Sequence, residues 1–230
     1  MKLISLTDYN DPKSLGSRFR AKRMAPLVEL IKNVHAEKGS VSILDVGGRQ
    51  TYWMSLEGTF LQDHNVVVTI LNLPSDLQGQ DDQIFKHVTG DACNMPEFSP
   101  NEFDIVHSNS VIEHVGNWDK IKEFAREVSR VAPYLFVQTP YFWFPVEPHF
   151  LKPFHHWLPR PLRVSIFLRF DMHCQARALN LNEAMKRAED DPYLLDFRMF
   201  RFLFPDSEII RERFLIFTKS MVAIRNCSPK

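Results

Sequence analysis

Short apolar runs alternate, along the first part of the chain, with segments whose apolar residues recur at helical spacing. Val41–Val46 and Tyr134–Thr139 are such runs, and Asn65–Leu73 is a nearly continuous apolar and β-branched run, typical of a strand buried on both faces. Two further strands are predicted at Ile84–Val88 and Phe103–His107. Strands separated by helical segments at this spacing predict a mostly parallel sheet covered on both faces.

Helices are predicted before and between these strands. Apolar residues recur at helical spacing over Ser17–His35, where Pro26 either divides the helix or marks its first turn. The segments Thr51–Leu61, Val111–Val115 and Asp119–Ala132 are also predicted to be helical. These helices supply the layers that a parallel sheet needs.

The pattern changes after the fifth predicted strand. Residues 140–161 are rich in proline, histidine and aromatic residues. They form either a stiff aromatic lid that fills space over the sheet edge or a wall of a substrate site. A polar helix is predicted at Asn180–Asp190, followed by an aromatic segment, Leu194–Phe204. The last two strands, Glu208–Phe214 and Lys219–Arg225, are close enough to form an antiparallel hairpin.

These elements together predict a single α/β domain. Its fold is a Rossmann-like, doubly wound sheet of about seven strands, mostly parallel with an antiparallel C-terminal strand, plus an aromatic cap insertion. The predicted parts are an N-terminal helical arm (1–40), a cofactor-binding core (41–139), the cap (140–205) and a closing hairpin (206–230).

Composition narrows the partners and the compartment. The chain has 230 residues, and its 28 basic residues balance 28 acidic ones, which gives no reason to expect nucleic acid or an anionic membrane as a partner. Cys93, Cys174 and Cys227 lie far apart, so reduced thiols in a cytoplasmic protein are expected. The N-terminus is not typical of a signal peptide, and no apolar run is long enough to predict a membrane span.

Four turns that carry glycine or short polar side chains follow successive predicted strands. Any one of them is typical of an ordinary loop or helix cap. In a doubly wound sheet, however, the carboxyl ends of the strands line one crevice, so four such turns predict a shared site for a ribose, an adenine and an amino-acid group. The turns are Asp45-x-Gly47-Gly48, Asn72-Leu73, Gly90-Asp91-Ala92 and Ser108-Asn109-Ser110.

The order and spacing of four segments resemble those of class I S-adenosylmethionine-dependent methyltransferases, particularly the small-molecule group called type 11. The segments are Ile-Leu-Asp-Val-Gly-Gly (43–48), Val-Thr-Ile-Leu-Asn-Leu (68–73), Gly-Asp-Ala-x-x-Met-Pro (90–96) and Phe-Asp-Ile-Val-His-Ser-Asn-Ser-Val-Ile-Glu-His-Val (103–115). The closing strand pair also resembles the antiparallel end of that family's seven-stranded sheet. The resemblance implies S-adenosylmethionine as the cofactor.

The resemblance also implies roles for individual residues. Asp45, Gly47 and Gly48 of the first turn would hold the methionine end of the cofactor, and Asn72 of the second turn would bind the ribose hydroxyls. Asp91 and Ala92 of the third turn would contact the adenine, and Ser108 of the fourth turn would lie on the side of the sulfonium.

The sequence departs from the family pattern at two places. Arg49 and Thr51 replace later loop glycines, and Asn72 replaces an acidic residue. An amide offers the ribose fewer acceptors than a carboxylate, and one lost hydrogen bond costs about 1 kcal/mol, or roughly tenfold in affinity. Arg49 is either a surface residue or a contact to the cofactor carboxylate or the substrate.

Methyl transfer requires alignment of the acceptor with the methyl group, and a hydroxyl acceptor also requires a base for its proton. The predicted catalytic residues are His114 and His149. His155 and His156 are further candidates, and Glu147 lies beside them in the sequence. Glu113 and His114 with a later histidine could instead bind a divalent metal, but their spacing is too sparse to favour this, and no metal is predicted.

The predicted function is methyl transfer from S-adenosylmethionine to an O or N atom of a small molecule or glycan (EC 2.1.1). The aromatic, histidine-rich cap is the reason to include a saccharide acceptor. A dinucleotide-dependent oxidoreductase would need G-x-G-x-x-G after the first strand, which Arg49 and Thr51 interrupt. The second alternative is a non-catalytic relative that serves as a binding or regulatory module.

Overall fold

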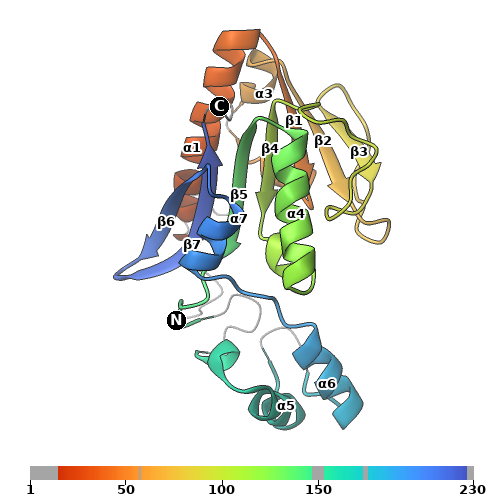
Figure 1. The fold of residues 1–230 in the computed structure, drawn as a ribbon, viewed down its shortest axis with the longest axis vertical. Coiled ribbons are helices and arrows are strands. Elements are labelled where there is room, and N and C mark those ends of the chain that lie inside the picture. The colour runs from red at the N-terminus through yellow and green to blue at the C-terminus, as the bar shows by residue number, and fades with distance from the viewer. Residues whose placement is uncertain (1–14, 57, 147–152, 173–175, 227–230) are drawn as a thin grey trace.

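A single seven-stranded sheet is the centre of the molecule. The structure, a computed structural model, describes residues 15–56, 58–146, 153–172 and 176–226. The strand order is β3-β2-β1-β4-β5-β7-β6 (Figure 1), with β1 to β5 parallel and β7 antiparallel to both of its neighbours. The strands are β1 (Val41–Val46), β2 (Val66–Asn72), β3 (Phe85–Thr89), β4 (Ile105–Asn109), β5 (Tyr134–Pro140), β6 (Glu208–Phe214) and β7 (Phe217–Arg225). The predicted fold class is confirmed.

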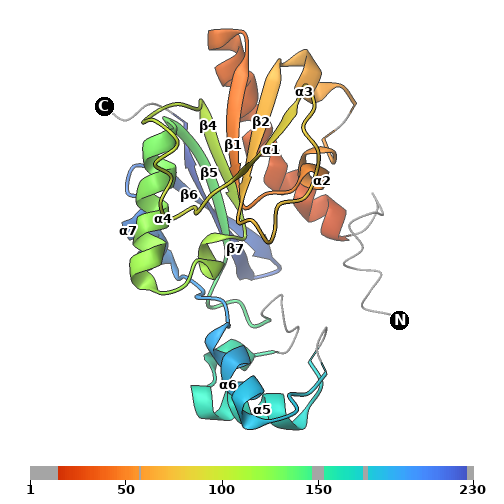
Figure 2. The same cartoon turned by 90° about the vertical axis from the view of Figure 1, so that its right-hand side faces the viewer.

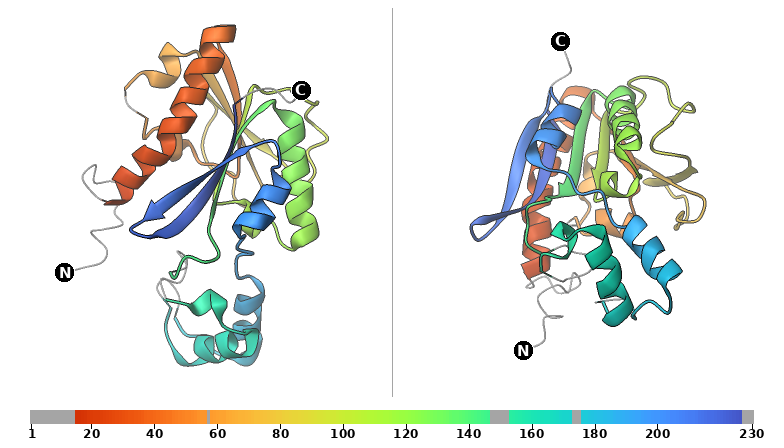
Figure 3. Two further views of the ribbon diagram at one scale, coloured as in Figure 1. Left: turned by 60° about the vertical axis from the view of Figure 1, so that its left-hand side comes forward. Right: turned by 60° about the horizontal axis from the view of Figure 1, so that its bottom comes forward.

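Successive residues of each strand pack into two apolar layers. Ile43 and Ile105 lie in the layer that helix α1 (Leu15–Lys38) covers, whereas Leu44 and Val106 lie in the opposite layer. Helices α4 (Trp118–Val131) and α7 (Phe197–Leu203) cover that second layer. Figure 2 and the left view of Figure 3 show the sheet between α1 and α4.

Capping side chains explain where the helices on the second face begin. The side chain of Asn117 accepts a hydrogen bond from the backbone N–H of Lys120 at the start of α4. Asp196 accepts from two backbone N–H groups at the start of α7. Each cap satisfies donors that the first turn of a helix leaves without a partner.

Helix α1 continues through Pro26, so this proline neither divides the helix nor marks its first turn. The fully buried side chains of Leu27 and Ile31 follow it directly. Their burial against the sheet offsets the hydrogen bond that a proline in a helix interior removes.

The prediction of one helix over Thr51–Leu61 is wrong. The structure has two short helices instead, α2 (Gln50–Trp53) and α3 (Phe60–Asp63). Between them Gly58 adopts a positive φ of 56°, which a helix interior does not allow. The side chain of Trp53 is fully buried and bonded to Asp45, so packing rather than helix propensity fixes this segment.

The cap lies below the carboxyl edge of the sheet (Figures 1 and 3) and has an apolar cluster of its own. Its elements are the 3-10 turn η3 (His155–Trp157) and the helices α5 (Arg160–Arg169) and α6 (Leu181–Glu189). The cluster that these elements enclose consists of Val164, Phe167, Met172, Ala178, Ala184 and Ala188. The sequence predicted α6 and missed α5, whose charged and apolar residues are not segregated along the helix.

No helix in the described part of the chain is long and apolar enough to cross a membrane.

Candidate functional site

The loop after β1 requires both of its glycines. Gly47 has a φ of 72°, and a Cβ there would lie 2.5 Å from Cγ2 of Val111. At Gly48 a Cβ would lie 1.7 Å from Oδ2 of Asp45. The backbone N–H of Gly47 donates to the carbonyl of Leu71 at 2.8 Å, which joins the loop to β2. Only residues without a Cβ fit this path.

Asn72, at the end of β2, stabilises the same loop. Its side-chain amide Nδ2 donates to the carbonyl oxygen of Gly48 at 2.9 Å. An ionised carboxylate at this position would have no proton to donate and would repel that carbonyl. The departure from the family pattern at position 72 therefore has a structural reason, because the amide ties the loop to the sheet.

A cavity of about 520 Å³ opens at the carboxyl ends of the first four strands. We call it the cofactor cavity. Its volume lies in the range of small-molecule and cofactor sites. Its lining combines apolar side chains with charged groups of both signs: Gly47, Arg49, Leu71, Asn72, Leu73, Asp76, Gly90, Asp91, Ala92, Cys93, Ser110, Val111, His114, Val115 and Lys120.

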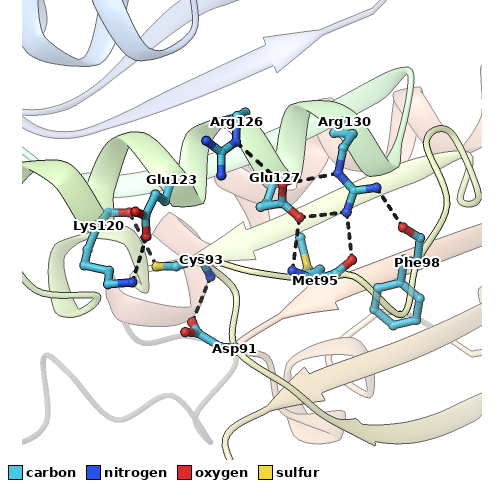
Figure 4. Close-up of polar contacts among 9 residues, drawn as sticks. All are labelled: Asp91, Cys93, Met95, Phe98, Lys120, Glu123, Arg126, Glu127 and Arg130. Atoms are coloured by element: carbon cyan, nitrogen blue, oxygen red, sulfur yellow. Dashed lines mark hydrogen bonds and ion pairs between the residues drawn. The ribbon is translucent and has the colours of Figure 1, made fainter.

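The turn after β3 forms one wall of the cofactor cavity. Asp91 accepts a hydrogen bond from the backbone N–H of Cys93 at 2.8 Å, which closes the turn (Figure 4). Burial first, and the charge of Asp91 second, raise the pKa of the Cys93 thiol to about 11. The thiol is therefore neutral near pH 7 and is not a nucleophile.

An ion pair on α4 holds the segment that follows this turn (Figure 4). Glu127 accepts from the backbone N–H of Met95 at 3.0 Å and from the guanidinium of Arg130 at 2.7 Å. Arg130 also donates to the carbonyls of Met95 and Phe98, both at 2.7 Å. The bond from Arg130 lowers the pKa of Glu127, so the pair is charged near pH 7 and fixes the wall to α4.

Asp45 and Ser108 lie behind the cofactor cavity rather than in its lining. Asp45 is fully buried and accepts from Nε1 of Trp53 and from Nδ1–H of His107, both at 2.6 Å. Because a carboxylate can only accept, His107 carries its proton on Nδ1. The hydroxyl of Ser108 donates to the carbonyl of Val46 at 3.1 Å.

Sequence reasoning missed His107 and Trp53. The ring of His107 stacks on Phe136 with 5.5 Å between centroids, and Tyr52 and Trp53 lie 4.8 and 5.0 Å away. The sequence did indicate that His107 is buried, since the alternation along β4 places it on the same face as Ile105. What the sequence did not reveal is that Asp45 on the neighbouring strand would meet it.

The candidate histidines occupy different environments. His114 is exposed and lines the cofactor cavity, whereas the adjacent Glu113 is buried and accepts from the hydroxyl of Thr139 at 3.1 Å. His155 is buried against the ring of Phe167, 5.1 Å away. Among the described residues, no three His, Cys, Asp or Glu side chains come together in a way that could hold a metal ion.

Three candidates remain. Nε2–H of His156 donates to the carbonyl of Phe142 at 2.8 Å, which holds the cap together. His149 and Glu147 lie outside the described residues.

Comparison with protein families finds one match within the chain, and the matched residues include most of those that line the cofactor cavity. Residues 48–133 match a family described as "Methyltransferase domain". This part of the chain resembles a methyltransferase domain. The resemblance to type 11 methyltransferases is thus confirmed, and S-adenosylmethionine is the cofactor that the match implies.

Solved structures share the fold at low sequence identity. A chain of the complex between the Trm112 methyltransferase activator and a methyltransferase from Haloferax volcanii is 12% identical, with a TM-score of 0.51; the match covers 92% of this chain and 98% of that one. An O-methyltransferase family protein from Burkholderia thailandensis is 10% identical, with a TM-score of 0.48; the match covers 99% of this chain and 65% of that one. This chain therefore spans slightly less than two thirds of the length of the Burkholderia protein.

A third solved structure contains ligands. The 1,6-didemethyltoxoflavin-N1-methyltransferase of Burkholderia thailandensis, with bound 1,6-didemethyltoxoflavin and S-adenosylhomocysteine, is 13% identical, with a TM-score of 0.49; the match covers 90% of this chain and 79% of that one. A comparison with curated protein sequences gives no match.

Proposed function

We propose that this chain transfers a methyl group from S-adenosylmethionine to an O or N atom of a small molecule or glycan. The observation that carries the proposal is the cofactor cavity of about 520 Å³, which opens at the carboxyl ends of β1 to β4 within the matched domain. Three glycines, Gly47, Gly48 and Gly90, bring backbone close to this cavity where a Cβ would clash. Such a cradle suits a nucleoside with an amino-acid tail.

The sequence-predicted residues divide into two groups with different proposed roles. Gly47, Asn72, Asp91 and Ala92 line the cavity and would contact the cofactor. The other three residues would act through the loop, because their contacts hold its backbone in place. These are Asp45, Gly48 and Ser108.

Asn72 would bind the ribose with its side-chain oxygen, since its amide nitrogen donates to Gly48. One fewer charge-assisted bond than an acidic residue provides would weaken cofactor binding about tenfold. Arg49 lines the cavity next to Gly47, and its guanidinium suits the carboxylate of the cofactor in a charge-assisted pair. The arginine would then offset the loss at the ribose.

S-adenosylmethionine supplies an electrophilic methyl group on a sulfonium. As the lone pair of the acceptor O or N atom bonds to the methyl carbon, the carbon–sulfur bond breaks, its electrons go to sulfur, and the proton of the acceptor passes to a base. His114 is the proposed base, because it is an exposed histidine in the lining of the cavity. The chain's main contribution would be alignment of the acceptor and exclusion of water.

The cap supports an aromatic or saccharide acceptor. Trp143 is 55% exposed and Trp157 is 36% exposed, and their rings lie 5.9 Å apart at the carboxyl side of the sheet. Exposed aromatic faces of this kind bind sugar or aromatic rings. The alternative to a methyltransferase is a non-catalytic binding module. Its support is that Asn72 and Arg49 depart from the family pattern.

Calorimetric titration separates these possibilities. Binding of S-adenosylmethionine without binding of NAD is expected. No heat with S-adenosylmethionine would contradict the proposal, and heat with NAD alone would favour an oxidoreductase. Binding without methyl transfer to any of a broad panel of hydroxyl and amine acceptors would favour the non-catalytic module.

A further inference from the structure

At the carboxyl edge of the sheet, several strands carry polar residues on the face that α1 covers. On β4, Ile105 packs under α1, and Asn109 lies on the same face because strand residues alternate. On β6 and β7, Ile210 and Val222 pack under α1, which places Glu212 and Ser220 on that face too. An otherwise apolar interface thus turns polar at the edge where the cap begins.

Arg23 of α1 connects these polar groups. Its Nε donates to both carboxylate oxygens of Glu212, at 2.9 and 3.0 Å, and its Nη1 donates to Oδ1 of Asn109 at 3.0 Å. The Arg23 and Glu212 side chains are only 16% and 13% exposed. The hydroxyl of Ser220 also donates to Glu212. A partly desolvated guanidinium is thereby held in one orientation by two strands.

A second cavity, of about 250 Å³, opens beside Arg23 between α1 and the β6–β7 hairpin. We call it the hairpin cavity, and the left view of Figure 3 shows the first turns of α1 beside this hairpin. Arg213 lines it together with Arg23, and Glu212 is the one acidic residue of the described lining; Arg211 also lines it, but its guanidinium lies 4.2 Å over the ring of Phe197 on α7. The lining therefore has an excess of positive charge.

Lys219 is a further cation close enough to Arg23 to feel its charge. Burial lowers the pKa of Lys219, and the charge of Arg23 lowers it further, whereas Glu212 opposes the shift. Arg23 and Lys219 therefore repel each other in a partly buried place. A bound anion would relieve the repulsion between these two cations, and it would gain from their low solvent exposure.

Two consecutive residues, Asn109 and Ser110, lie between Arg23 and the cofactor cavity. Asn109 contacts Arg23, and Ser110 lines the cofactor cavity. Ser110 turns the chain with a φ of 57°, and its hydroxyl donates to Oε1 of Gln138 at 2.8 Å. A molecule held at Arg23 would therefore lie beside the place where the cofactor cavity begins.

We propose that the acceptor carries an anionic group, a carboxylate or a phosphate, which binds in the hairpin cavity to Arg23 with Asn109 and Lys219 beside it. This inference rests on the proposed methyl transfer and names the class of its acceptor. Arg23 is a specificity-determining residue, since its fixed guanidinium favours planar carboxylates and phosphates over neutral groups.

Titration followed by amide NMR tests this proposal, with inorganic phosphate and acetate as separate probes in the presence of S-adenosylhomocysteine. Saturable shifts at Asn109 and Ser220 are expected for at least one anion, and the tighter anion identifies the group. Arg23→Met should weaken that binding about tenfold or more. Arg126→Met, which removes an exposed arginine from the opposite face, should leave it unchanged.

The outcomes separate the inference from the function it rests on. Absence of saturable shifts, or equal binding by Arg23→Met and the unaltered chain, would overturn the inference. Should Arg23→Met fail to fold, Asn109→Ala removes one contact of the guanidinium and supplies the same comparison. Shifts at Asn72 and Asp91 on addition of S-adenosylhomocysteine report the cofactor site independently, and their absence would count against the proposed function instead.

Discussion

The two cavities at the carboxyl edge of the sheet are built from different parts of the chain. The cofactor cavity depends on backbone: Gly47 and Gly48 bring the loop close, and the amide of Asn72 fastens it. The hairpin cavity depends on long side chains, above all the pair between Arg23 and Glu212. Backbone geometry tolerates almost no substitution, whereas side-chain contacts can be adjusted one group at a time.

The largest expected effect is therefore that of Gly48→Ala. The new Cβ would lie 1.7 Å from Oδ2 of the fully buried Asp45, so the loop has to move. We expect loss of S-adenosylhomocysteine binding in calorimetry and destabilisation of about 1–3 kcal/mol in denaturant unfolding. Gly39→Ala is the matched control, because its Cβ would meet nothing within 4 Å and only its φ of 76° is strained.

Equal cofactor affinity for Gly48→Ala and Gly39→Ala would contradict the view that the loop backbone defines the cofactor cavity.

An intermediate effect is expected of Asn72→Asp, although an acidic residue is what the family pattern has there. The new carboxylate would gain a ribose contact and lose the donor to the carbonyl of Gly48. Because the loop would be released and its Gly48 carbonyl repelled by the new charge, this loss should exceed the gain at the ribose, and we expect S-adenosylhomocysteine to bind more weakly. Asn65→Asp is the control: its Nδ2 donates to the carbonyl of Gly39 at 3.0 Å, in a loop that does not line the cavity.

Tighter binding by Asn72→Asp would show that the ribose contact outweighs the tie to the loop, and the proposed role of Asn72 would then be wrong.

The smallest effect belongs to the hairpin cavity and is a change in one pKa. Burial and the charge of Arg23 both lower the pKa of Lys219. In Arg23→Met the second cause disappears, so the pKa should rise, yet it should stay below its usual value because burial remains. An NMR titration of the lysine side-chain signals measures this, with Arg126→Met as the control. An unchanged pKa would mean that the two cations do not interact.

The strands that carry the cofactor cavity could be predicted because their signals are local. The apolar runs at Val41–Val46 and Asn65–Leu73 and the glycines after the first strand are each readable within a few residues. Parallel pairing then brings their ends together without further information. The predicted fold is confirmed for this reason.

Contacts between distant segments could not be predicted in the same way. Arg23 and Glu212 are 189 residues apart, and Asp45 and His107 are 62 apart. Nothing local marks such partners, since an isolated arginine or histidine is equally typical of a solvated surface. The helix expected at Thr51–Leu61 failed for another reason, because the chain leaves the helical conformation after Trp53 and Gly58 adopts a positive φ of 56°.

A crystal structure with S-adenosylhomocysteine tests the central claim most directly. The account predicts the adenine beside Asp91 and Ala92, a ribose hydroxyl within hydrogen-bond distance of Oδ1 of Asn72, and the carboxylate of the ligand paired with Arg49. Its sulfur should face the side of the cavity that Ser110 lines. A ligand bound elsewhere, or one whose ribose and carboxylate avoid Asn72 and Arg49, would contradict the account.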